Sequence, residues 1–466
     1  MLIKLNQVKK RRILYNCKAV IEKIEMNRCL KILNSFLLIT ILSQPLFAQN
    51  KLTVEQAITA TIENNFDILL LRNDSVSYAL DKSYARAAFL PRLNATTGLV
   101  FNNNNQKQEL ADGTKRDSKG VRSNNLNGAV QLNWTLFDGF KMFATRDKLS
   151  QFVLLGELNI KNQVVNSVAA VINNYYNIVR QKQQLKAIEE QMGINEERVK
   201  IAEKKFSVGL GAKPDVLQGK VDLNAQKAAR LKQQTLIDQL KEQLNQLMNV
   251  EMNTRYEVVD TITFKDDIIV ADILGTVETT NPQLLVTKKN IDISKLTLKE
   301  RKAERYPVVS FNSAYNYSKT NNQTVINTFT PLYNRNNGFN YGIGITVPIF
   351  NGFNVRRQIQ QAQLDIDWLN ITYKNQKSQI DLGITNAFKD YELQKKTLAL
   401  EEENILLAKE NVYIALERLR LGVSTYLELR ETQKSLELAY DRLIAARYNT
   451  KLAETELLRL KGDLVK

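Results

Sequence analysis

The working part of this chain lacks the side chains that most often carry catalysis. Its 466 residues contain no histidine and two cysteines, Cys17 and Cys29, both in an N-terminal segment that we expect to be removed. Zinc sites, thiol nucleophiles and imidazole acid/base chemistry are then excluded from the mature chain. The sequence also has no GxxxxGK phosphate-binding loop. Only closely spaced carboxylates remain as candidates for an enzyme, so we expect no enzymatic activity, no cofactor and no metal site.

The N-terminus has the pattern of a secretory signal peptide. The basic residue Arg28 precedes an apolar run at 32–42, and Ala48 is a small residue of the kind found before a cut. The run is too short to cross a bilayer as a permanent helix. We therefore expect residues 1–48 to be an N-terminal extension with a signal peptide, and the mature chain to begin at Gln49.

The charge balance gives little sign of nucleic-acid binding. The full chain carries +16, but residues 1–48 hold nine of its Lys and Arg and two of its Asp and Glu, which leaves +9. The basic run Lys9–Arg12 could be a nucleic-acid patch. A basic run before a signal peptide is more simply a long n-region, or sequence upstream of a start at Met26. We expect no nucleic-acid partner.

Proline placement predicts two very long helices. Residues 140–206 and 353–421 contain no proline and few glycines. At 1.5 Å per residue, each stretch would form a helix of roughly 100 Å. Apolar residues recur at helical spacing in both, which favours amphipathic helices packed side by side as in a coiled coil.

Shorter helical stretches accompany each long one. Capping-box and first-turn proline signals mark their starts, and we expect them to stack end to end alongside the long helix of their half. These stretches run from Thr53 to near Leu90, from Pro214 to about Asn249, onward from Asn281-Pro282, and from about Thr425 to Leu460.

The two halves repeat each other at offsets of 213 or 216 residues. The matching segments are Phe89-Leu90-Pro91 with Arg305-Tyr306-Pro307, Phe137-Asp138-Gly139 with Phe350-Asn351-Gly352, and Val208-Gly209-Leu210 with Leu421-Gly422-Val423. We therefore predict a first repeat at 49–250, a second at 272–466, and between them an equatorial, collar-like segment at 251–271.

Each repeat contains two segments in which the hydrophobic period changes from 3.6 to 2. Such alternation, with aromatic ends and polar loops, is typical of transmembrane β-strands. The predicted strands are 93–102, 126–136, 308–318 and 341–349, in hairpins at about 91–138 and 306–350, with polar loops at Asn103–Asn124 and Lys319–Asn340. Aromatic residues that could lie at the membrane interfaces are Trp134, Phe137, Tyr306, Tyr317, Phe350 and Phe353.

A soluble antiparallel sheet with one buried face would give the same alternation. The signal peptide and the matching position of both hairpins favour the membrane instead. Four strands cannot close a barrel, and an open edge cannot face lipid, so several copies must contribute. We predict a mainly α fold with transmembrane β-strands: four strands per protomer in a 12-stranded trimeric barrel, plus a long periplasmic α-helical coiled-coil barrel.

This order of elements resembles the outer membrane factor family, the TolC-like outer membrane efflux proteins. The resemblance covers Gln49 to about Gly462. It is carried by the prolines at the strand entries, Pro91 and Pro307, by the corners Phe137-Asp138-Gly139 and Phe350-Asn351-Gly352, and by the tips of the helical hairpins at Gly209 and Gly422. It implies a homotrimer in the cell outer membrane with a periplasmic helical extension. Its partners would be outer-membrane lipid, a periplasmic adaptor and, indirectly, an inner-membrane pump that supplies the energy for efflux or type I secretion.

The resemblance also implies roles for residues at the helical tips. Two family acidic residues that ring the entrance and favour cations match Glu428 and Glu431, which would place six carboxylates round the mouth of a trimer. Glutamate is, however, also favourable in a first helical turn for electrostatic reasons alone. Both interpretations remain open.

Asp215 matches a family aspartate that helps hold the entrance shut. The tyrosine and arginine partners of the family fall at Leu419 and Ser424, so Asp215 is either a gating residue or only a charge that stabilises its helix. The adaptor-docking tips would be Val208, Gly209 and Leu210 with Leu421, Gly422 and Val423. The turn geometry alone would also demand the glycines.

The main rival is a periplasmic coiled-coil scaffold or adaptor, which would also have a leader and long helices. Such a protein has no use for two hairpins with aromatic ends. The exported substrate and the cognate adaptor and pump cannot be derived from the sequence.

Overall fold

The computed structural model describes residues 51–264, 268–324 and 329–464. The expected leader, residues 265–267 of the predicted inter-repeat segment, and residues 325–328 of the second predicted loop lie outside these ranges. The chain divides into two units. The first is Met1–Leu52 with Arg255–Glu257, and it contains the two-residue strand β1 (Lys51–Leu52). The second is Thr53–Thr254 with Val258–Lys466, which we describe from here on.

Two helices of 67 residues dominate this second unit. They are α4 (Lys141–Ser207) and α8 (Asn354–Arg420), which confirms the two long helices to within a residue at each end. The remaining helices are α2 (Val54–Asn64), α3 (Phe66–Ser83), the 3-10 helix η1 (Tyr84–Phe89), α5 (Lys213–Met248), α6 (Val270–Thr280), α7 (Pro282–Ala303) and α9 (Tyr426–Lys461).

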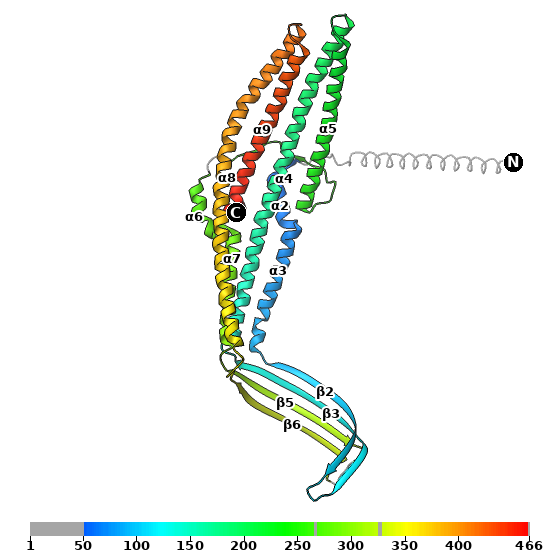
Figure 1. Ribbon diagram of the computed structural model, residues 1–466, viewed down its shortest axis with the longest axis vertical. Helices are drawn as coiled ribbons and strands as arrows, with labels where there is room; N and C mark the ends of the chain where they lie inside the picture. The colour runs from blue at the N-terminus through cyan, green and yellow to red at the C-terminus, as the bar shows by residue number, and fades with distance from the viewer. Residues whose placement is uncertain (1–50, 265–267, 325–328, 465–466) are drawn as a thin grey trace, which may run out of the picture. The chain divides into compact units, whose positions relative to one another are not determined.

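The shorter helices lie along the long ones, as expected. Both α3 and α5 pack against α4, while α7 and α9 pack against α8 (Figure 1). In addition, α4 contacts α7 and α9, so the first repeat packs against the second within one chain. None of the helices in the described ranges is long and apolar enough to cross a membrane.

The predicted helix from Thr53 to Leu90 is wrong in one respect, because it is broken at Asn65. The side chain of Asn65 accepts hydrogen bonds from the backbone N–H groups of Asp67 and Ile68, and its amide donates to the Leu247 carbonyl at 2.9 Å. A buried asparagine thus competes with the helical backbone and starts a new helix. Thr53 does form the predicted capping box, with Gln56.

An asparagine caps the corresponding helix in the second repeat as well. Asn281 caps α7 and donates to the Leu460 carbonyl at 2.8 Å. The offsets from Asn65 to Asn281 and from Leu247 to Leu460 are 216 and 213 residues, the offsets of the sequence repeat. One contact is therefore built twice, and the two repeats fold alike around it.

The apolar core lies along the seams between paired helices. Leu419 of α8 packs with Leu429 and Leu436 of α9, all almost fully buried. Val168 and Ile178 of α4 are also inaccessible to solvent. Burial of each such side chain contributes roughly 1.5–3 kcal/mol, so these seams hold the long helices together.

Four long strands form one antiparallel sheet in the order β2-β3-β5-β6 (Figure 1). Their bounds are β2 (Arg92–Glu109), β3 (Lys115–Phe137), β5 (Val308–Asn322) and β6 (Tyr333–Thr346), and the two-residue strand β4 is Glu257–Val258. The two hairpins join through β3 and β5, where Val130 lies opposite Tyr315. Within the described residues, β2 and β6 are edge strands without a further partner.

The predicted polar loops are much shorter than expected. In the first hairpin, β2 and β3 continue well beyond residue 103 and leave only residues 110–114 between them. Backbone pairing does not need apolar side chains, so the asparagine-rich segments extend the ladder, with an irregularity between Asn104 and Gln106. At the other end, β6 stops at Thr346 rather than near 349, because Pro348 has no N–H to donate.

Candidate functional site

The two helical tips close with the same turn. Gly209 and Gly422 both adopt the left-handed conformation, with φ of 79° and 80°. In the first tip, Leu210 N–H bonds the Lys205 carbonyl at 2.8 Å, and in the second, Val423 N–H bonds the Arg418 carbonyl at 3.0 Å. These are Schellman turns, in which glycine is favoured because its φ is positive.

The predicted docking residues lie at the ends of these turns. Leu210, the most exposed of them, has 82% of its surface accessible, and Val208, Leu421 and Val423 are exposed as well. Four exposed aliphatic side chains at two adjacent turns form an apolar surface that the single chain leaves uncovered. Their role in docking remains a prediction.

The tips of the two repeats are bonded to each other. Lys205 Nζ donates to the Leu419 carbonyl at 2.8 Å and lies 5.9 Å from the centre of the Tyr426 ring. Below them, Arg420 pairs with Glu197 at 3.0 Å. At this end of the chain, the two helical hairpins are therefore joined by a hydrogen bond and an ion pair.

The two predicted ring carboxylates have different surroundings. Glu428 Oε1 pairs with Arg418 at 3.1 Å, and its Oε2 accepts from Ser424 Oγ at 2.7 Å. Glu431, one turn later, is exposed and its carboxylate has no bonded partner in the described part of the chain. Only Glu431 therefore presents an uncompensated negative charge.

Asp215 is the third residue of α5. The residue at the N-cap of that helix, Ala212, makes no side-chain hydrogen bond to the helix. The family's tyrosine does not fall at an equivalent position, and Leu419 is buried in the α8/α9 seam. The structure instead brings Tyr426 near Asp215: burial, followed by the charge of Asp215, raises the pKa of the Tyr426 phenol. The phenol oxygen is buried and has no hydrogen-bond partner among the described residues.

Sequence reasoning missed a buried polar cluster below the tips. Arg198, only 4% exposed, pairs with Asp222 of α5 and donates to Gln433 of α9 at 3.4 Å, and Gln433 donates to Asn195 at 3.1 Å. Burial opposes ionisation of Asp222, but hydrogen bonds from Arg198 and Gln218 and the charge of Arg198 hold its pKa below the ordinary value. Polar residues at apolar positions of the helical pattern were the signal that could have revealed the cluster.

The two faces of the sheet have opposite character. Directly opposed residues share a face. On one face, rows such as Ala95, Val130, Tyr315 and Phe339 are mostly apolar. On the other, the rows beginning with Asn94, Thr96 and Gly98 contain twelve residues, and none is charged. Those residues are Asn94, Gln131, Ala314, Asn340, Thr96, Ala129, Asn316, Gly338, Gly98, Asn127, Ser318 and Asn336.

Five of the six predicted interfacial aromatics lie where the sheet meets the helices. Trp134 donates its indole N–H to the Phe89 carbonyl at 2.8 Å, and Phe137 packs edge-on against Phe140 with 5.3 Å between ring centres. The pair Phe350 and Phe353 repeats that geometry at 5.5 Å, and Tyr306 lies against Gly139. The sixth, Tyr317, is farther along β5, opposite Gly128 and Asn337.

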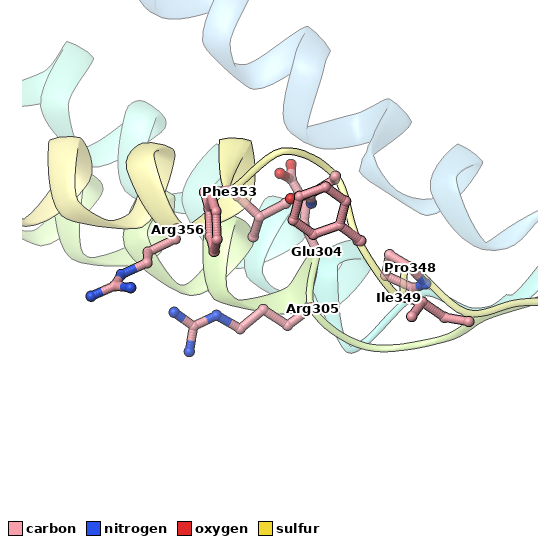
Figure 2. Close-up of a pocket in the computed structure, with 9 residues that line it drawn as sticks. Glu304, Arg305, Pro348, Ile349, Phe353 and Arg356 are labelled. Carbon is pink, nitrogen blue, oxygen red and sulfur yellow. The ribbon is translucent and has the colours of Figure 1, made fainter.

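A pocket of about 230 Å³ lies at the same junction in the second repeat. Glu304 and Arg305 at the end of α7, and Pro348, Phe350 and Arg356 around the start of α8, line it. Figure 2 shows Arg305 and Arg356 extending to the same side of the ribbon. Neither here nor in any other part of the described chain do three or more His, Cys, Asp or Glu side chains form a group that could hold a metal ion.

The sequence and the fold are similar to those of known proteins. The family model described as "Outer membrane efflux protein" matches residues 57–250 and 274–463. The chain is 20% identical over 342 residues to the outer membrane efflux protein BepC of Brucella suis biovar 1 (strain 1330), covering 72% of each chain. It is 21% identical over 286 residues to the outer membrane protein TolC of Vibrio cholerae serotype O1 (strain ATCC 39315 / El Tor Inaba N16961), covering 60% of each.

The fold is similar to that of the Campylobacter jejuni CmeC outer membrane channel, with a TM-score of 0.74 and 14% identity over 88% of this chain and 85% of that one.

Proposed function

This chain belongs to the outer membrane efflux protein family, and on that premise we propose that three copies form a passive duct through the outer membrane and the periplasm. In the proposal, the sheet lies in the membrane, the helices extend into the periplasm, and the tips meet a periplasmic adaptor coupled to an inner-membrane pump. The duct itself catalyses no reaction.

One observation carries the proposal: an open sheet whose apolar face is exposed. Leu93, Phe101, Ile343 and Ile345 all expose more than half of their surface on that face. Neither a free strand edge nor unpaired backbone is tolerated in lipid, so β2 and β6 need partners there. Three copies supply twelve strands, an even number within the range of known barrels and wide enough for a channel.

The length of the apolar face fits a membrane. On β5 the apolar face runs from Val309 to Tyr317, which is nine residues. A transmembrane strand tilted by about 45° needs roughly 9–11 residues to cross the hydrocarbon core. Transmembrane barrels carry an apolar band of ≈ 25 Å, flanked by aromatic residues. Beyond Tyr317, Lys319 lies opposite Arg335, so charge begins where the band would end.

The opposite face suits a water-filled lumen. Its three uncharged rows offer amide and hydroxyl groups to water and apply no fixed charge to a passing solute. The helices would continue this duct for roughly 100 Å. Selection by charge would then fall to the tips, where Glu431 is exposed, and Asp215 with Tyr426 would contribute to the contact that closes the entrance.

Recording conductance in planar bilayers tests the proposal. Protein extracted from outer membranes with detergent is expected to migrate as a trimer and to form discrete channels. A stable monomer that is soluble without detergent and shows no conductance would refute the duct. That result would support the rival function, a periplasmic coiled-coil scaffold.

A further inference from the structure

The corner between the sheet and the helices occurs twice, but the single chain covers only one copy. In the first repeat, Gly139 is buried against the second repeat: a Cβ built on it would lie 2.4 Å from the Ala303 carbonyl oxygen and 2.9 Å from Tyr306 Cβ. Next to it, Lys141 pairs with Glu304 at 2.9 Å. Tyr306 and its neighbours thus cover the corner formed by residues 137–140.

The equivalent corner in the second repeat is bare. Gly352 has the same left-handed conformation, with φ of 63°, but no atom lies within 4 Å of its built Cβ. Ile349 and Phe350 expose 94% and 75% of their surfaces. The pocket in Figure 2 opens beside these residues.

The sequence offsets identify the segment that is missing from the bare corner. Tyr306 corresponds to Leu90 at an offset of 216, and Gly139 corresponds to Gly352 at an offset of 213. The Asn65 and Asn281 contacts show that these offsets carry structure as well as sequence. In its own chain, Leu90 exposes 61% of its surface.

We propose that Leu90 of a second copy of this chain occupies the pocket beside Phe350, and that β2 of that copy pairs with β6 in one defined register. The proposal rests on the trimeric duct and specifies its seam between copies. The occupant is a second copy, because the repeat shows which segment this corner is shaped to receive.

The register follows from the contact between β3 and β5. Val130 lies opposite Tyr315, and Leu132 lies opposite Ser313. Moved by the same offsets, these pairs become Ile343 opposite Leu99 and Ile345 opposite Thr97 of the second copy. Each transferred pair lies on the apolar face in both strands, so the apolar and polar faces continue across the seam.

An unsatisfied polar group supports the same arrangement. Glu300 of α7 accepts from Thr145 Oγ1 of α4 at 2.6 Å. At the repeat offsets, Glu300 corresponds to Tyr84 and Thr145 corresponds to Gln358. Gln358 Oε1 is buried without a hydrogen-bond partner in the described residues, and Tyr84 is exposed. The hydroxyl of Tyr84 in the second copy can donate to that oxygen.

Cysteine cross-linking tests the register, in a background in which Cys17 and Cys29 are serine. The variants Leu99→Cys with Ile343→Cys and Thr97→Cys with Ile345→Cys are expected to form covalent dimers and trimers in outer membranes. The control Leu99→Cys with Ile345→Cys uses the same strands shifted by two residues. Its diagonal Cβ separation, roughly 7 Å, exceeds the reach of a disulfide.

The pocket is tested by Leu90→Ala, with Leu332→Ala as the control because Leu332 is equally exposed at 60%. Leu90→Ala is expected to lower the temperature at which the trimer dissociates in SDS, whereas the control leaves it unchanged. Tyr84→Phe, which removes only the hydroxyl, is expected to give a smaller downward shift.

The outcomes separate the seam from the duct. Cross-links only in the shifted control, or none in a conducting trimer, would overturn the register and leave the duct intact. Equal dissociation temperatures for Leu90→Ala, the control and the unmodified chain would overturn the occupant of the pocket. A monomer without conductance would overturn the duct and the seam together.

Discussion

The unequal surroundings of the two tip glutamates lead to a sharp prediction about ion selectivity. Glu428 is compensated by Arg418 at 3.1 Å, while Glu431 is exposed and unpaired. In a trimer, Glu431→Gln removes three uncompensated charges from the entrance. Replacing Arg418 and Glu428 together with glutamine removes six charges but leaves the net charge unchanged.

The size of the effect follows from Coulomb's law. For a cation about 8 Å from each of three carboxylates in water, screening at 0.15 M salt leaves a local enrichment of about 3-fold. At 0.01 M the screening length is roughly 30 Å, and the enrichment rises to about 7-fold. The cation preference lost in Glu431→Gln should therefore be larger at low salt.

Reversal potentials in planar bilayers under a salt gradient measure this preference. Glu431→Gln is expected to lose most of it, and the double replacement of Arg418 and Glu428 is expected to keep it. The opposite ranking would show that Glu428 acts as a ring charge despite its partner. A preference unchanged in both variants would refute a selective ring at the tips.

Three further predictions concern the fold, the buried cluster and the lumen. Asn281→Ala should lower the free energy of unfolding by about 2 kcal/mol, because it removes a helix cap and leaves the Leu460 carbonyl unpaired. Asn65→Ala should lower it by the same amount, as measured by urea unfolding. A loss of stability in only one of the two variants would contradict the reasoning. The lowered pKa of Asp222 adds stability above its unfolded pKa that disappears as pH falls through its folded pKa, so Asp222→Asn should destabilise at pH 7 and flatten stability against pH below about 4. Asn127→Asp should raise cation preference from the polar sheet face, whereas Thr97→Asp, on the apolar face, should reduce the yield of trimer in the outer membrane.

The regular elements were predictable because strong local signals specify them. Proline-free amphipathic stretches gave α4 and α8 nearly to the residue, and alternation gave all four long strands. The break at Asn65 was missed because asparagine also occurs inside helices and only its bond to Leu247 decides the outcome. Comparing Asn65 with Asn281-Pro282, 216 residues later, would have revealed it.

The site was predictable only as far as the tips and the corners. Turn glycines mark both tips, but no sequence pattern shows that Glu428 is paired while Glu431 is free. The strand lengths were underestimated because asparagine-rich segments pair through the backbone. The alternation of apolar and polar side chains does not detect such pairing. Long-range pairing of polar groups, as in the Arg198 cluster, depends on the packing of three helices. Polar residues at apolar positions of the helical pattern can therefore indicate a buried cluster, but they do not show which residues pair.

The difference between the repeats explains how the tips come to hold each other. At an offset of 213 residues, Lys205 corresponds to Arg418 and Asp215 corresponds to Glu428. In the second tip the basic residue pairs with the acidic one, but in the first, Lys205 instead donates across to the Leu419 carbonyl.

Because Lys205 bonds to the second tip and not to Asp215, a bond that lies within the second tip is replaced in the first by a bond between the two tips. The charge of Asp215 then lies beside the buried Tyr426 phenol. A hydrogen bond from an ammonium group to a carbonyl contributes only a few kcal/mol at most. The Lys205 bond is therefore a weak contact, which acts together with the Arg420–Glu197 ion pair to hold the two tips of one chain to each other.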